Sequence, residues 1–167
     1  MNSSRPVIRD LERSRVDIAL EVLAFGGLVV LIALPALYYS TLPKTIPQHF
    51  NLKGQADGWG DKSSLLMMPV SGVIVFVALT VLARFPHVFN YPWPITEANA
   101  RSQYSISRQM LSAVKFELVA SFAYMTWSTI RTAMGAQSGL GSFFTVVQVP
   151  IVFAILGVYL FKLSRVR

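Results

Sequence analysis

The chain has 167 residues, of which 53% are hydrophobic and only 14% are charged. A soluble domain carries about 25% charged residues, so this composition argues against one modest soluble core and predicts a membrane protein. The formal charge is +7, but the basic residues lie between apolar runs and not on one polar face, which argues against a nucleic-acid partner. The absence of cysteine excludes disulfides, thiolate catalysis and cysteine-based metal sites.

The first apolar run covers residues 18–39 and follows four arginines. It is longer than the roughly 7–15 apolar residues of a signal peptide, so it predicts an uncleaved first membrane span. Ser14 and Asp17 resemble a capping box that starts this helix ahead of the membrane. We expect Asp17 and Glu21 simply to begin the helix, where its dipole favours negative charge.

Three further runs of about 20 residues are long enough to cross the hydrocarbon of a bilayer. They cover residues 65–85, 110–130 and 143–163; the third of the four spans is the weakest, because Lys115 and Glu117 fall inside it. We therefore predict an all-α fold, a four-transmembrane-helix bundle in which residues 1–167 form a single integral membrane domain.

The flanking basic residues predict the orientation of the bundle. Ten lie on one side of the predicted spans, namely Arg5, Arg9, Arg13, Arg15, Arg84, Arg101, Arg108, Lys162, Arg165 and Arg167. The other side has Lys44, Lys53, Lys62 and Arg131. Because the richer side is normally cytoplasmic, we expect both termini inside and the connection of residues 40–64 outside.

This outer connection is the most informative segment. Its prolines, Pro43 and Pro47, favour an extended ribbon over residues 42–50. A turn is expected at residues 51–54, and a second tight turn at residues 57–61. The connection is either a rigid cap with Trp59 as its plug or a recognition surface for a peptide, lipid headgroup or partner protein. The residues that would make the contacts are His49, Phe50, Asp57, Trp59 and Lys62.

His49, Asp57 and Asp61 are candidate ligands for a metal site, but their spacing matches no helical metal motif. The sequence has no G-x-S-x-G, H-E-x-x-H or phosphate-loop motif. We therefore expect no catalytic residues, no metal and no cofactor.

Polar residues inside the third and fourth spans form a second group of interest. Glu117 is either a proton or cation site or, if the span enters lipid later, an interfacial residue. Lys115 is expected to extend toward the cytoplasmic interface. Gln148 is expected to bond to another helix, beside a carbonyl that Pro150 frees.

The two other connections are also informative. Residues 86–107 form the inner connection, in which Thr96 is a candidate N-cap for a polar helical stretch that runs into the third span. Residues 132–142 are expected to form a plain short loop between the third and fourth spans.

The outer connection resembles a known domain. Pro43-Lys44-Thr45-Ile46-Pro47-Gln48-His49-Phe50, followed by Asp57-Gly58-Trp59-Gly60 and Lys62, is similar to the domain of unknown function at the start of SdpI-type membrane proteins, an immunity and signal-transduction family. The resemblance covers about residues 20–85 and implies a multi-pass protein of the bacterial plasma membrane with this loop outside. It would imply toxin resistance and sensing, but the chain lacks the additional C-terminal spans of SdpI-type members.

These observations predict a non-enzymatic membrane protein whose outer loop recognises a ligand or partner. Two alternatives stay open: an accessory structural subunit of a larger membrane complex, and a proton-coupled carrier that uses Glu117. The expected partners are the lipid bilayer and other membrane proteins.

Overall fold

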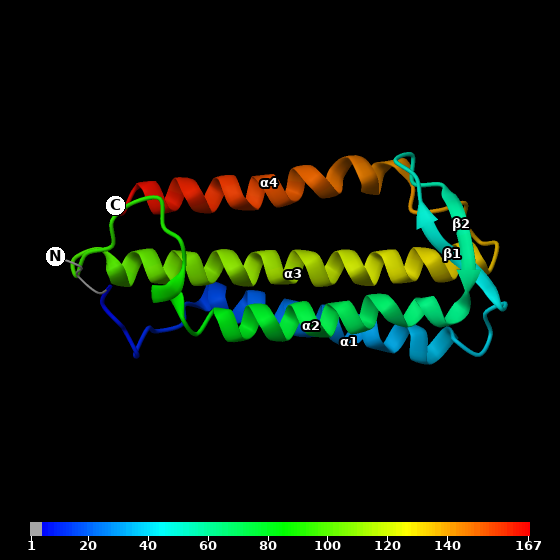
Figure 1. Cartoon of the computed structure of the whole chain (residues 1–167), viewed down its shortest axis with the longest axis horizontal. Helices are drawn as coiled ribbons and strands as arrows, with labels where there is room; N and C mark the ends of the chain where they lie inside the picture. Colours follow the sequence, from blue (N-terminus) through cyan, green and yellow to red (C-terminus); the bar gives the residue numbers. More distant parts are fainter. Residues whose placement is uncertain (1–4) are drawn as a thin grey trace.

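The structure is a computed structural model that describes residues 5–167, except the side chains of Ser142, Phe143, Thr145 and Val149. It is mostly helical, with long helices side by side and a β-hairpin at one end (Figure 1). The elements are α1 (Arg15–Tyr38), β1 (Thr45–Phe50), β2 (Ala56–Asp61), the 3-10 helix η1 (Lys62–Leu66), α2 (Met67–Leu82), the 3-10 helix η2 (Pro86–Val88), α3 (Ala100–Ala133) and α4 (Ser142–Ser164). The all-α prediction is therefore wrong at the hairpin, where β1 and β2 form a two-stranded sheet.

Three of these helical stretches, within the described residues, are long and apolar enough to cross a membrane. They are Arg15–Tyr38, Lys62–Leu82 and Val146–Ser164, which correspond to the first, second and fourth predicted spans. Much of their apolar surface is exposed, including Phe25 on α1, Ile74 on α2 and Phe153 on α4. Such faces suit a lipid environment, because no other part of the described chain covers them.

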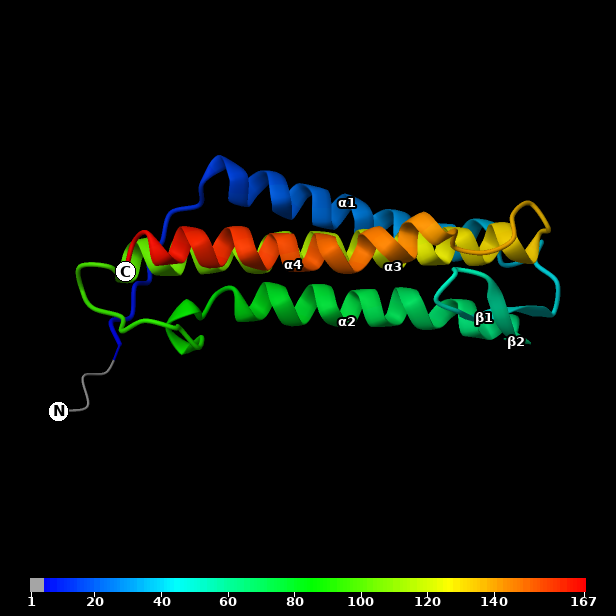
Figure 2. The ribbon, with the colours of Figure 1, turned by 90° about the horizontal axis from the view of Figure 1, so that it is seen from above.

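Helix α3 lies between the other three helices. It contacts α1 and α2 on one side and α4 on another (Figure 1, Figure 2). It contains residues 110–130, but it begins ten residues earlier and is more polar than the other helices. Its position explains this composition, because many of its polar side chains are buried against the neighbouring helices: Gln103, Ser107, Ser112, Lys115, Glu117, Ser121, Thr126, Ser128 and Thr132.

A small apolar core joins α1 to α3 in the middle of the bundle. Leu28 and Leu31 of α1 pack against Val119 and Ala123 of α3. These residues recur every three or four positions, so each pair lies on one face of its helix. The contact fixes α1 along α3 and thereby sets the relative position of polar residues on the two helices.

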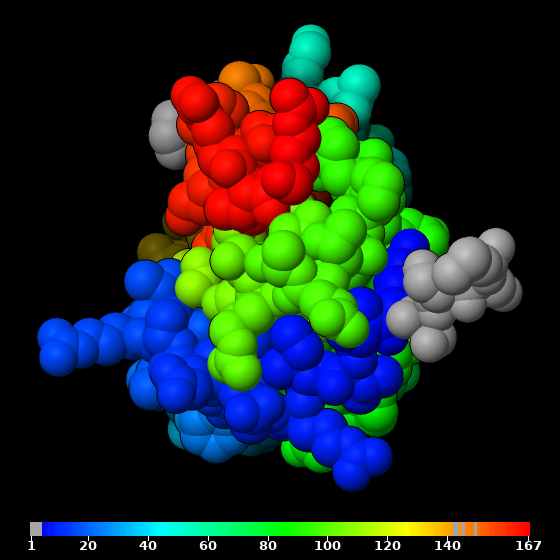
Figure 3. Space-filling model, turned by 90° about the vertical axis from the view of Figure 1, so that its left-hand side faces the viewer, coloured from blue at the N-terminus to red at the C-terminus, as the bar shows by residue number. Residues whose placement is uncertain are grey.

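The two ends of the bundle differ in composition. The segment before α1, the C-terminus and the 83–99 connection lie at one end, which we call the termini end, and the hairpin lies at the other, the hairpin end (Figure 1, Figure 3). All ten flanking basic residues named above belong to the termini end: six lie outside the helices, and Arg15, Arg101, Arg108 and Lys162 lie within α1, α3 and α4 near this end. The two groups of basic residues distinguished in the sequence thus lie at opposite ends of the bundle.

The predicted helix starts are confirmed for α1 and displaced for α3. Ser14 caps α1, and its side chain and that of Asp17 bond reciprocally as a capping box. For α3 the N-cap is Asn99 and not Thr96. Thr96 still contributes, because its hydroxyl accepts a bond from the Asn99 amide and its own amide donates to the Asn99 side chain.

Candidate ligand-binding site at the hairpin end

The hairpin forms where the sequence predicts an extended ribbon and a turn. Strands β1 and β2 are antiparallel, with Thr45 opposite Asp61 and His49 opposite Gly58. The predicted turn is confirmed, since the Gly54 amide donates to the Asn51 carbonyl at 2.8 Å. The second predicted turn, at residues 57–61, is wrong: this segment is strand β2. Gly58 of β2 leaves room for His49 on β1, because a Cβ at position 58 would lie 2.9 Å from the Cβ of His49.

Ile46 anchors the hairpin to the helices. Its side chain is completely buried, and it packs with Leu42 of the connection after α1, Leu65 of η1 and Ile130 near the end of α3. Lys62 strengthens the same junction, because its Nζ donates to the Tyr39 carbonyl at 3.2 Å and lies over the Tyr39 ring. Of the predicted contact residues, Lys62 is therefore engaged inside the protein.

The tip of the hairpin is fixed to the connection between α3 and α4. The Gly54 carbonyl accepts a 2.7 Å bond from the Leu140 amide, and Gln55 forms an isolated bridge with Gly139. Gly54 has φ +74°, and a Cβ there would lie 2.7 Å from the Gly141 carbonyl oxygen. The predicted plain loop over residues 132–142 is therefore a second support for the hairpin.

An apolar cleft of about 310 Å³ lies beneath the hairpin, between β1, α2 and α3. Phe50 and Pro47 line it from the hairpin, and Met67, Met68 and Met125 line it from the helices. Methionine side chains are flexible and polarizable, so they adapt to apolar groups of different shapes. We call this feature the methionine cleft.

The polar residues of the hairpin lie outside the cleft. His49 Nδ1 and Asp57 Oδ1 are 2.5 Å apart, and their side chains are 73% and 43% exposed. Trp59 is 55% exposed, so its predicted role as a plug is wrong. An exposed tryptophan and an exposed hydrogen-bonded His49–Asp57 pair on an anchored hairpin form a contact surface of the kind that binding partners use.

Of the three residues considered as metal ligands, His49 and Asp57 contact each other, whereas Asp61 is bonded elsewhere. The Asp61 carboxylate accepts a bond from the Ser63 amide at 2.8 Å and so caps η1. Hydrogen bonding from Ser63 lowers the pKa of Asp61. Among the described residues, no group of three or more His, Asp or Glu side chains is placed to hold a metal ion.

Glu117 lies in a polar cluster between α3 and α4. Its carboxylate accepts a 3.0 Å bond from the Ser121 hydroxyl, and Gln148 of α4 donates to both residues. Gln148 thus bonds to another helix, as predicted. Lys115 lies elsewhere: it is 1% exposed and pairs with Glu21 of α1 at 2.6 Å. Its predicted extension toward the interface is wrong, and so is the assignment of Glu21 as a mere helix-start residue.

The methionine cleft was not found from the sequence. Met67 and Met68 are adjacent, but Met125 lies on α3, and only the packing of α3 along α2 brings the three together. The only signal in the sequence was that Met67 and Met68 closely follow the segment predicted to be a recognition surface.

Comparison with known proteins finds a family match over the segment that contains the hairpin. A family described as a domain of unknown function, DUF1648, matches residues 26–73. This segment includes the second half of α1, the whole hairpin and the first residues of α2.

The chain is also similar to an "Uncharacterized protein" from Archaeoglobus fulgidus. The two are 33% identical over an alignment 66 residues long, which covers 35% of this chain and 36% of the relative. The chain thus covers about a third of that relative's length. No solved structure matches the chain.

Proposed function

We propose that this chain is a non-enzymatic multi-pass membrane protein that binds an amphipathic peptide or a partner protein at its hairpin end. The observation that carries the proposal is the methionine cleft directly beneath an anchored hairpin. Apolar side chains of the ligand would occupy the cleft, and its polar groups would contact His49, Asp57 and Trp59.

The contacts of the hairpin support this proposal. The hairpin is held at its base by Ile46 and at its tip by the 134–141 connection, so binding would not have to order a mobile loop. His49 and Asp57 pair with each other and Trp59 is exposed, whereas Ile46 and Lys62 hold the hairpin to the rest of the chain. Aromatic anchors next to a pocket are the usual centre of a binding surface.

We also propose that α3 crosses the bilayer with the other three helices, and that the protein is SdpI-like. Helix α3 has 34 residues, equivalent to about 51 Å at 1.5 Å per residue, and runs between helices apolar enough to cross. The basic termini end would then be cytoplasmic and the hairpin outside, in a bacterial plasma membrane. The resemblance of the hairpin to SdpI-type proteins supports a role in toxin immunity or sensing.

Replacement of the exposed and cleft-lining hairpin residues tests the binding proposal. The triple variant His49→Ala, Phe50→Ala, Trp59→Ala should reduce the amount of a co-purifying ligand by at least about tenfold, because truncation of central contact residues commonly costs 1–2 kcal/mol each. The measurement is gentle-detergent purification followed by mass analysis and quantification of each bound species.

The matched control is Leu52→Ala with Lys53→Ala. Both residues lie on the exposed hairpin turn and neither lines the cleft. The control variant should retain the ligand at the unmodified level. Equal retention by the triple variant, folded and expressed like the control, would contradict the proposal.

A further inference from the structure

A second cavity, of about 220 Å³, lies at the termini end of the bundle. It is bounded by the segment before α1, the first turns of α1, the end of α2 and the first half of α3. Four arginines are among the residues that line it: Arg9, Arg13, Arg84 and Arg108. We call it the arginine cavity.

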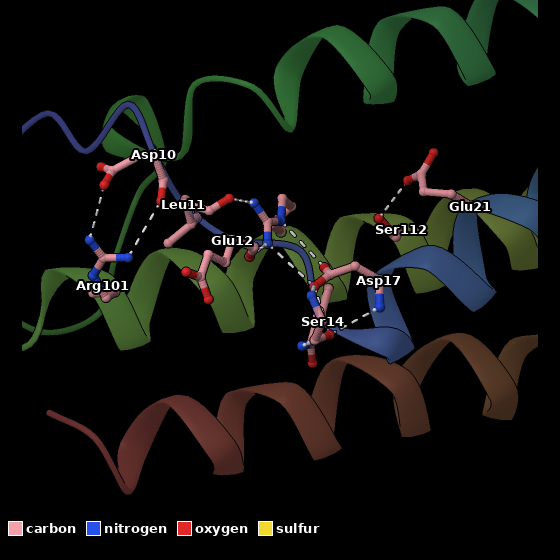
Figure 4. A network of polar contacts seen from close by, with 10 residues as sticks. Asp10, Leu11, Glu12, Ser14, Asp17, Glu21, Arg101 and Ser112 are labelled. Atoms are coloured by element: carbon pink, nitrogen blue, oxygen red, sulfur yellow. Dashed lines mark hydrogen bonds and ion pairs between the residues drawn. The ribbon is translucent and has the colours of Figure 1, made fainter.

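The acidic residues of this cavity are already paired. Asp17 is 3.3 Å from the Arg108 guanidinium, and Glu21 is 2.6 Å from Lys115 Nζ. Ser112 also donates to Glu21, and Asp17 bonds to its capping partner Ser14 (Figure 4). The carboxylates are thus satisfied by groups within the bundle.

The other three arginines remain available to a ligand. Across residues 5–167, no carboxylate lies within 4 Å of Arg9, Arg13 or Arg84. They come from two different segments and line one concave site. Guanidinium groups bind phosphate oxygens through paired hydrogen bonds, so three of them around one cavity suit a phosphate group.

The location of the cavity indicates where the phosphate would come from. It lies where the apolar stretches Arg15–Tyr38 and Lys62–Leu82 begin and end, at the level where they would leave the hydrocarbon. In a bilayer this is the depth of the lipid phosphates. Basic pockets between membrane helices bind anionic headgroups at this level.

One wall of the cavity, the segment before α1, is held in place by hydrogen bonds from α3. Arg108 donates to the Leu11 carbonyl at 2.9 Å and to the Glu12 carbonyl, so it holds the segment before α1 across the end of α3. Tyr104 donates to the Pro6 carbonyl at 2.9 Å and holds the same segment further along. Arg9 and Arg13 are therefore presented to the cavity from a segment that is tied down on either side.

We propose that the arginine cavity binds the phosphate group of an anionic lipid headgroup. The purified full-length protein in mild detergent should retain phosphatidylglycerol in preference to phosphatidylcholine, as measured by native mass spectrometry. The triple variant Arg9→Gln, Arg13→Gln, Arg84→Gln should lower this retention by at least about tenfold, since each basic residue near an anionic lipid contributes about fivefold to binding.

A second variant with the same change in charge distinguishes binding in the cavity from general electrostatic attraction between the protein and anionic lipid. Arg15→Gln, Arg165→Gln, Arg167→Gln removes three positive charges from the termini end, but none of these residues lines the cavity. This variant should retain phosphatidylglycerol, and both variants should unfold at the temperature of the unmodified protein. Equal losses in the two variants, or equal retention of the two lipids by the unmodified protein, would overturn the proposal.

Competition with inorganic phosphate shows whether the cavity also accepts a free phosphate ion or requires the phosphate group of an intact lipid. If millimolar phosphate displaces phosphatidylglycerol from the unmodified protein, the cavity recognises the phosphate group itself and accepts a soluble source. If it does not, the lipid chains contribute and the ligand is the intact lipid. Both results support a phosphate site, and neither depends on what binds at the hairpin end.

Discussion

Replacement of Lys115 by methionine should lower the free energy of unfolding by about 3–5 kcal/mol, because it leaves the Glu21 carboxylate without its cation inside the bundle. Lys115 Nζ donates to both Glu21 oxygens, at 2.7 and 2.6 Å, and to the Thr80 hydroxyl at 2.9 Å. It also lies 4.8 Å from the centre of the Phe76 ring. One side chain of α3 thus joins α1 and α2. Thermal or denaturant unfolding in detergent measures the loss.

The double variant Glu21→Gln, Lys115→Met tests whether the pair itself accounts for the effect. It should be more stable than the sum of the two single losses predicts, by about 1–3 kcal/mol, because neither charge is then left unpaired. Lys53→Met, on the exposed hairpin turn, is the matched control and should change stability little. A Lys115→Met protein as stable as this control would show that the ion pair does not hold the helices together.

Replacement of Ile46 by alanine should cost about 2–5 kcal/mol, since it empties a completely buried site in the core that joins the hairpin to the helices. The expected result is a hairpin that separates from the bundle before the helices do. Hydrogen exchange should then increase across β1 and β2 far more than across α3.

Val7→Ala gives the comparison for this experiment, because Val7 is 60% exposed and lies in the segment before α1. It should leave exchange in the hairpin unchanged. If Ile46→Ala increased exchange equally in the hairpin and in α3, the hairpin would be part of one cooperative unit and not a separately anchored cap. The methionine cleft would then depend on the whole bundle.

The three apolar stretches could be predicted from the sequence because lipid-facing helices must be apolar on most of their surface. Helix α3 is different, since it is surrounded by the others and can bury polar residues that find partners there. Its polar composition weakened the hydropathy signal over residues 110–130, although the helix is continuous from Ala100 to Ala133. Helix α3 is more polar than the other helices because it lies between them. This position cannot be inferred from composition.

The partners of the polar side chains could not be predicted from the sequence. Lys115 was expected to reach the interface because its only near carboxylate along the chain, Glu117, lies on a different side of the helix. Its actual partner, Glu21, is 94 residues away and becomes adjacent only when α1 packs along α3. Asp17 and Arg108 meet in the same way.

The hairpin was predicted in part. Pro43, Pro47 and the Asn51–Gly54 turn have local signatures, so strand β1 and the turn followed from the sequence. Strand β2 did not, because Asp57-Gly58-Trp59-Gly60-Asp61 has the composition of a turn. Its glycines are instead small residues in a strand, and Gly58 makes room for the side chain of His49 on the opposite strand.

The most direct test of the account is the side of the membrane on which each end of the bundle lies. The chain has no cysteine, so single cysteines are clean probes. Lys53→Cys on the hairpin should react with a membrane-impermeant maleimide in intact cells. Ser164→Cys at the end of α4 should react only after the cells are permeabilised. Labelling of both positions in intact cells, or of Ser164→Cys alone, would contradict a four-crossing bundle with its hairpin outside and its termini inside.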